Sequence, residues 1–237
     1  MNRALLKQDA KDAMRAATPH PALTTLAYLA ISIAFSMVIC AVSSIFGITG
    51  ALLGSETVGV FSAFISMILA VVLTLLAATI QFGYYVYCLK VFKHEETGVG
   101  ELFGYFSLFL KIFGLSLWIA LFVWLWSLLC FIPGIIAGLR YSQAFFILAE
   151  NPEKGIRECV NESKLLMSGR LWEFFVLQLS FIPWSILTAI TCGIAGLYVT
   201  PYTTVTFAGY YLSLKPPTDS QPGYNSYEGN EQGGYQQ

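Results

Sequence analysis

Residues 133–169 read PGIIAGLRYSQAFFILAENPEKGIRECVNESKLLMSG, and this stretch decides the fold because an apolar segment runs directly into a charged amphipathic one. Before Glu150, the apolar segment contains a single charged residue, Arg140. Asn151 and Pro152 then predict the start of a helix, because Asn caps the free amides of a first turn and Pro suits the first helical position. The rest of the chain repeats this alternation of apolar and charged segments.

Residues 152–168 predict an amphipathic helix. Apolar side chains recur at helical spacing, charged side chains cover the other side, and Gly169 suits the end of a helix. The apolar positions are Ile156, Cys159, Val160 and Met167. We interpret this segment as a helix on the membrane surface. A connector helix packed on the membrane spans is the alternative, since both would show the same pattern.

The composition is typical of a membrane protein. Hydrophobic residues make up 56% of the chain and charged residues 11%, whereas charged residues make up about a quarter of a soluble domain. The five cysteines form no CxxC pair and are interpreted as reduced, small apolar residues. A disulfide between Cys130 and Cys192 is the alternative to that interpretation.

Six apolar segments have the length of about 20 residues that a bilayer core requires. They are expected at about 22–46, 58–91, 108–131, 133–150, 171–190 and 194–214. The second is longer than the core, so that it must tilt, protrude or be interrupted. Pro183 and Pro201 lie inside the last two, where each predicts a kink that faces protein rather than lipid.

Both ends of the chain are predicted to lie outside these spans. Residues 2–17 predict a surface helix whose basic side chains recur every fourth position, a stripe that suits an anionic leaflet or a solvated face. Residues 215–237 are rich in Pro, Gly, Gln and Asn, which predicts a disordered tail. Tyr224, Tyr227 and Tyr235 in this tail are candidate partner contacts, with a simple spacer as the alternative.

The distribution of basic residues predicts the orientation. The turns at 47–57, 130–134 and 191–193 contain no Lys or Arg, whereas the opposite ends of the spans carry many. Cytoplasmic loops are enriched in Lys and Arg, so both termini should be cytoplasmic. The expected fold is therefore all-α: a polytopic transmembrane bundle of about six spans, residues 1–214, with amphipathic helices on its cytoplasmic face and the tail beyond.

Arg140 marks a candidate polar site inside the membrane. It lies about ten residues, or roughly 15 Å, from the inner end of its expected span, near the bilayer midplane. The same count places Gln81 and Gln178 at a similar depth in other spans. An arginine at this depth costs at least about 2.5 kcal/mol, so it should find acceptors. The cluster is interpreted either as a site for a small anion or lipid headgroup, or as a structural hydrogen-bonded clasp.

Gly134 and Gly138 form a GxxxG pair, which predicts close packing of another helix. The alternative is that this helix belongs to a second copy of the chain, in a homo-oligomer. We expect no enzyme: the HExxH, GxSxG and phosphate-loop motifs are missing, and His20 and His94 stand alone. No catalytic, metal or cofactor residues are assigned. The basic residues are spread along the chain, which argues against nucleic-acid binding.

Several segments resemble a large family of uncharacterised bacterial integral membrane proteins, a domain-of-unknown-function family commonest in Gram-positive bacteria. The resemblance rests on the motifs PGII, AENP, NESKLLMSG and LSFIPW within residues 132–184. It also rests on ALLKQDAKDAMR at 4–15 and TCGIAGLYVTPY at 191–202. Members usually carry a basic residue where Ala137 stands, whereas this chain has Arg140. The resemblance implies a multi-span protein of the bacterial plasma membrane and supplies no activity.

Two functions are therefore expected of a chain embedded in the lipid bilayer. The first is non-enzymatic transport or binding of a small anion or lipid through Arg140, Gln81 and Gln178. The alternative is a structural or interaction module that recruits partners through the inner surface helices and the tail.

Overall fold

The computed structural model describes residues 3–17, 21–52, 56–129, 131–191 and 193–215, and these residues are helical without any strand. The all-α fold class is therefore confirmed. The helices are α1 (Arg3–Ala16), α2 (Pro21–Leu52), α3 (Glu56–Phe92), η1 (Val99–Leu102), η2 (Phe106–Leu108), α4 (Phe109–Leu129), α5 (Phe131–Tyr141), α6 (Ala144–Glu150), α7 (Ile156–Leu166), α8 (Leu171–Leu179), α9 (Ile182–Ile190) and α10 (Gly196–Leu214).

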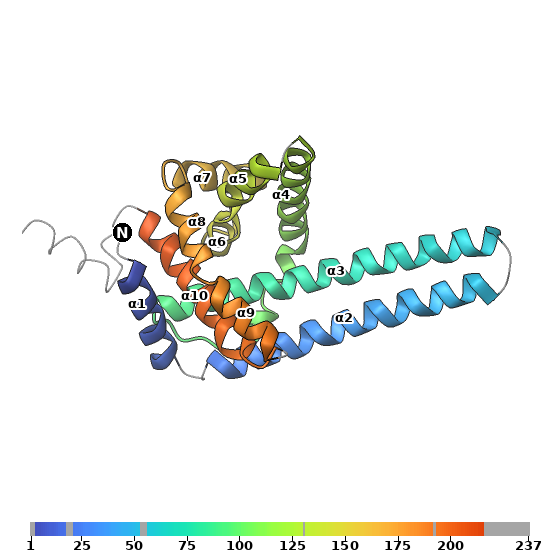
Figure 1. Ribbon diagram of the computed structural model, residues 1–237, viewed down its shortest axis with the longest axis horizontal. Helices are drawn as coiled ribbons and strands as arrows, with labels where there is room; N and C mark the ends of the chain where they lie inside the picture. Colours follow the sequence, from blue (N-terminus) through green and yellow to red (C-terminus); the bar gives the residue numbers. More distant parts are fainter. Residues whose placement is uncertain (1–2, 18–20, 53–55, 130, 192, 216–237) are drawn as a thin grey trace, which may run out of the picture.

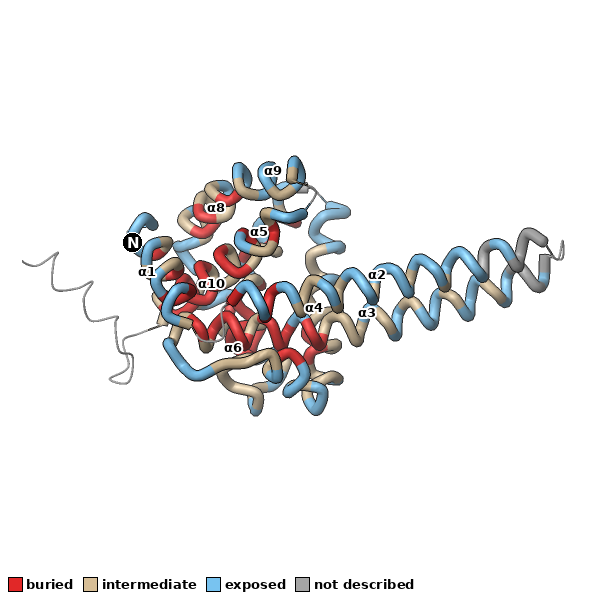
Figure 2. Tube along the Cα trace, turned by 90° about the horizontal axis from the view of Figure 1, so that it is seen from below, coloured by how far each residue is buried: buried red, intermediate tan, exposed pale blue. Residues whose placement is uncertain are grey.

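Helices α2 and α3 form a long hairpin that projects from a body built by the other helices (Figure 1). Their 32 and 37 residues correspond to about 48 and 55 Å, more than the roughly 30 Å of a bilayer core. The projecting part is coloured mostly as exposed (Figure 2). Its exposed residues include large apolar ones such as Phe61 and Met67. Hydroxyl groups there donate to carbonyls of their own helix, as Thr74 does to Ala70 at 2.8 Å. Exposed apolar side chains, together with hydroxyl groups that are hydrogen-bonded within their own helix, are compatible with the hydrocarbon core of a membrane.

Five stretches are long and apolar enough to cross a membrane: Pro21–Ile45, Val60–Phe92, Val99–Leu129, Ile132–Glu150 and Leu171–Ile190. This indicates a membrane protein. The sixth expected span corresponds to α10, which is helical but does not belong to these five. Instead, α10 lies within the body and has more buried residues than any neighbour among the described helices. Its successive residues Tyr210 and Tyr211 enter two different core clusters, so that α10 joins both halves of the body.

Two of the expected spans are each broken into two helices. The 133–150 segment divides into α5 and α6 at Ser142 and Gln143, and the 171–190 segment divides into α8 and α9 at Ser180 and Phe181. Pro183 follows the second break, near the start of α9, and is exposed. The expectation that this proline faces protein is therefore wrong, because a proline in the first turn leaves few carbonyls for neighbours to satisfy.

Pro201 behaves differently. It lies inside α10 and is buried against the rest of the body, as expected of a proline within a span.

The charged helix after the fourth expected span begins later than predicted. Asn151 and Pro152 lie in a turn, and α7 starts at Ile156 after Gly155. The Pro152 carbonyl accepts a hydrogen bond from the Lys111 ammonium at 2.7 Å, and the Gly155 amide donates to the Glu158 carboxylate at 3.0 Å. The Glu158 carboxylate thus caps an amide at the start of α7, in place of the cap expected from Asn151. The α7 helix ends before Gly169, whose φ of +76° is a conformation that glycine favours.

The helices do not all run parallel. Helix α4 rises steeply from the α2–α3 hairpin, and α5 returns beside it (Figure 1).

Candidate functional site

Arg140 lies at the end of α5, against α7. The Ser163 hydroxyl of α7 donates to the Arg140 carbonyl at 2.7 Å, which fixes the contact between the two helices. The Arg140 side chain is exposed, and within the described residues it has no hydrogen bond or ion pair. The midplane position assumed a continuous helix from Pro133 to Glu150. The break at Ser142 and Gln143 interrupts that helix, and the depth of Arg140 in the membrane stays a prediction.

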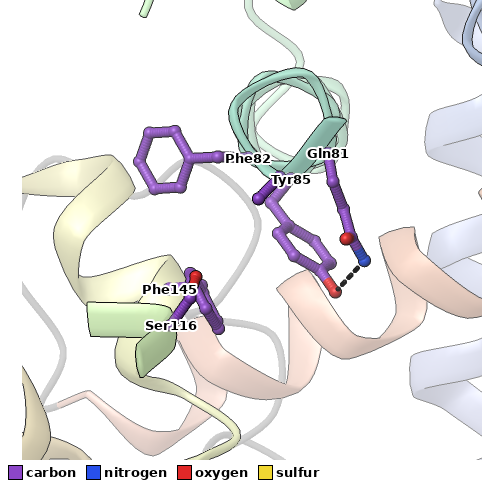
Figure 3. A pocket seen from close by; sticks show the side chains of 6 residues that line it. Gln81, Phe82, Tyr85, Ser116 and Phe145 are labelled. Carbon is purple, nitrogen blue, oxygen red and sulfur yellow. Dashed lines mark hydrogen bonds between the residues drawn. The ribbon is translucent and has the colours of Figure 1, made fainter. Parts of the chain in front are cut away.

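Gln81 lies on α3 beside a small cavity (Figure 3). Its amide donates to the Tyr85 hydroxyl at 3.3 Å, one turn further along the helix. Ser116 of α4 and Phe145 of α6 line the same cavity, whose volume is about 50 Å³. This volume accommodates a water molecule or two, whereas sites for organic ligands have several hundred Å³.

Gln178 lies on α8 and is half-buried. In the described part of the chain, no hydrogen bond joins any two of Arg140, Gln81 and Gln178. Each of the three side chains therefore has its own surroundings, and the structure does not assemble them into one clasp.

The two candidate packing glycines differ in their surroundings. Gly134 of α5 is buried, and a Cβ atom built on it would lie 3.0 Å from the Ser127 Cα atom of α4. A Cβ atom at Gly138 would meet nothing within 4 Å. Gly134 thus allows α4 and α5 of the same chain to approach closely.

A polar cluster that the sequence did not reveal is centred on Glu150, the last residue of α6. One carboxylate oxygen pairs with the Lys93 ammonium at 3.0 Å. The other accepts the Tyr211 hydroxyl at 2.7 Å and pairs with the Lys215 ammonium. We call Lys93, Glu150, Tyr211 and Lys215 the Glu150 clasp. It joins the ends of α3, α6 and α10, and its charged side chains are only about one-fifth exposed, with Glu150 at 21%.

A second pair lies nearby on α3. The Lys90 ammonium contacts the Glu101 carboxylate of η1 at 2.7 Å, and the Tyr105 hydroxyl donates to the same carboxylate at 3.1 Å. Gly83 lets η1 approach, because a Cβ atom there would lie 2.7 Å from the Glu101 carbonyl oxygen. These contacts hold η1 and the residues that follow it against α3.

Helix α1 packs on α10 and α3, and its Lys7 side chain contacts the break between α8 and α9. Its Leu6, Ala10, Ala13 and Met14 are buried in the core. The Lys7 ammonium donates to the Ser180 hydroxyl at 2.8 Å and lies 4.7 Å from the centre of the Phe181 ring. Burial, with the charges of Lys11 and Arg3, lowers the pKa of Lys7 from its ordinary value. The basic stripe is thus divided, and Lys7 faces protein rather than a leaflet.

Sequence reasoning missed the Glu150 clasp because its members come from three segments that only the tertiary fold brings together. The available signal was the position of Glu150 at the end of an apolar run, together with Lys93 and Lys215 at the ends of two others. Among the described residues, no group of three or more His, Cys, Asp or Glu side chains is arranged to hold a metal ion.

Part of the chain is similar to a protein family of unknown function. Residues 128–217 match the family described as "Protein of unknown function (DUF975)". This part contains α5 to α10, with Arg140, Gln178 and three of the clasp residues, but not Gln81 or Lys93. The match supports similarity to an uncharacterised family. No curated protein and no solved structure matches the chain.

Proposed function

We propose that the chain is a non-enzymatic membrane protein that acts as an interaction module. Its long apolar helices hold it in the bilayer, and its helical body presents the segment after Lys215 to a partner. In this proposal the chain crosses a bacterial plasma membrane about six times, with both termini in the cytoplasm. The absence of Lys and Arg from the three expected outer turns supports that orientation.

The observation that carries the proposal is the position of Lys215. Lys215 is held at the Glu150 carboxylate, which also bonds Lys93 and Tyr211. The tail is therefore attached to a residue that the body holds in place. A fixed origin confines the attached segment to a small volume and raises its effective concentration for a partner in the same membrane.

The composition of the tail supports a protein partner. Residues 216–237 contain Asp219, Glu228 and Glu231 and no Lys or Arg, so their net charge is negative. An anionic leaflet would repel this segment, which leaves it available in solution. Its tyrosines provide the amphipathic contact area that protein interfaces favour.

Transport or binding through Arg140, Gln81 and Gln178 has less support. No hydrogen bond joins any two of these side chains in the described residues, and the cavity beside Gln81 is about 50 Å³. The charged groups of the Glu150 clasp and of the Lys90–Glu101 pair are engaged with one another.

Affinity capture from cross-linked membranes tests the proposal. Three forms are compared at equal abundance: the wild type, a form without residues 217–237, and Arg140→Leu. We expect a defined partner protein with the wild type and with Arg140→Leu, and its loss from the shortened form. Loss with Arg140→Leu and retention without the tail would refute the proposal in favour of a function at Arg140.

A further inference from the structure

We propose that Arg140 and Lys164 bind the phosphate of an anionic lipid headgroup. This site is independent of the tail and goes beyond the proposed interaction function. The two residues belong to different helices, and the hydrogen bond from the Ser163 hydroxyl to the Arg140 carbonyl, at 2.7 Å, brings them together. The Lys164 ammonium lies 5.5 Å from the centre of the Tyr141 ring, next to Arg140 in the chain. We call Arg140 and Lys164 the cation patch.

The acidic side chains that flank Lys164 on α7 bond to groups other than Arg140 and Lys164. Glu162 pairs with Lys154 at 2.6 Å, and the Glu158 carboxylate accepts the Gly155 amide at 3.0 Å. Arg140 and Lys164 are both exposed, and neither has an ion pair within the described residues. Two neighbouring cations attract an anion, and a guanidinium group matches two phosphate oxygens at once.

The surroundings favour a lipid over a free phosphate ion. Leu165 follows Lys164 and is 77% exposed, and Ile136 lies one helical turn before Arg140 and is 40% exposed. Trp172 at the start of α8 is 73% exposed. Helix α5 contacts both α7 and α8, so the three helices that carry these exposed apolar side chains and the two cations lie next to one another. Cations beside exposed apolar and Trp side chains are typical of a surface at the boundary between headgroups and acyl chains.

The test uses the full chain in nanodiscs of phosphatidylcholine with or without phosphatidylglycerol, followed by native mass spectrometry of retained lipids. The double variant Arg140→Gln/Lys164→Gln removes the patch. Because the double variant loses two charge-assisted contacts to the phosphate, we expect it to retain phosphatidylglycerol roughly thirty-fold more weakly than the wild type. The charge-preserving variant Arg140→Lys/Lys164→Arg should keep most of the binding.

The matched control is Arg3→Gln/Arg15→Gln, which removes two exposed cations of α1. Phosphatidylglycerol retention should equal that of the wild type. Equal loss in the control and in the patch variant would mean general electrostatic attraction and would overturn the proposal, as would equal retention in all forms. Competition by inorganic phosphate, with no preference for phosphatidylglycerol over phosphatidylcholine, would overturn the lipid assignment.

Discussion

The ammonium group of Lys93 lies 3.0 Å from a carboxylate oxygen of Glu150, although the two residues are 57 positions apart in the chain. The Tyr211 hydroxyl and Lys215 ammonium share the other carboxylate oxygen. A single carboxylate thus joins the ends of three helices. Because it is mostly shielded from water, its loss leaves two cations without their partner.

Replacement of Glu150 by Gln should lower the free energy of unfolding by about 1–3 kcal/mol, since two largely buried ammonium groups lose their counter-charge. Equilibrium unfolding in mixed detergent micelles measures this change. The control is Glu162→Gln, which breaks the more exposed Lys154 pair within one short segment and should cost less than about 1 kcal/mol. A larger loss of unfolding free energy for Glu162→Gln than for Glu150→Gln would contradict a stabilising role of the Glu150 clasp.

Replacement of Ala10 by Leu should release α1. Ala10 is fully buried in the core, so that added methylene groups overpack the interface at a cost of about 1–3 kcal/mol. Lys7 and Lys11 then become accessible, and limited trypsin digestion should cut there faster than in the wild type. Gln8→Leu, at an exposed position of the same helix, should be cut like the wild type. Equal cleavage of both variants would contradict the docked position of α1.

The two glycines of α5 should respond differently to alanine. Gly134→Ala places a Cβ atom 3.0 Å from the Ser127 Cα atom, so that α4 and α5 must separate at a cost of about 1–3 kcal/mol. Gly138→Ala meets open space and should be neutral or slightly stabilising, because alanine favours the helix. Thermal unfolding in detergent separates the two variants. A loss of stability at Gly138 alone would instead indicate a partner helix from another chain.

The buried thiol of Cys159 tests the packing of α7. Burial, and then the nearby Glu162 carboxylate, raise the pKa of this thiol, so that the reactive thiolate forms only at higher pH than usual. With all other cysteines replaced, Cys159 should react with a maleimide only slowly until denaturant is added. Asn161→Cys in a chain lacking Cys159, at an exposed position of the same helix, should react at the rate of a free thiol. Similar rates at both positions would mean that α7 is not packed on the body.

The sequence predicted much of the helical fold. Hydrophobic runs identified α3 and α4 within two residues at each end, because a segment that must be apolar on every side has a strong compositional signal. The first run was correct at its start but ended too early, because α2 continues to Leu52 through residues expected to form a turn. It also predicted α1 and α7, whose apolar and charged faces alternate at helical spacing.

The breaks and the polar contacts were harder to predict. Ser142 and Gln143 carry no Gly or Pro signal, so that α5 and α6 were expected to be one helix. The contact between Arg140 and Ser163 of α7 was therefore not predicted. The Glu150 clasp depends on contacts between Lys93, Glu150 and Lys215, and a single sequence contains no information on which distant charges meet.

Site-specific photo-cross-linking in living cells tests most directly whether the tail contacts a partner protein. A photoreactive residue is placed at Tyr224 in the tail and, as a control, at exposed Asn161 of α7. We expect one discrete protein adduct from the photoreactive residue at position 224, both in the wild type and in Arg140→Leu. The photoreactive residue at position 161 should not form this adduct. No protein adduct from the tail, or cross-links to lipid alone, would contradict the claim that this chain is a membrane interaction module.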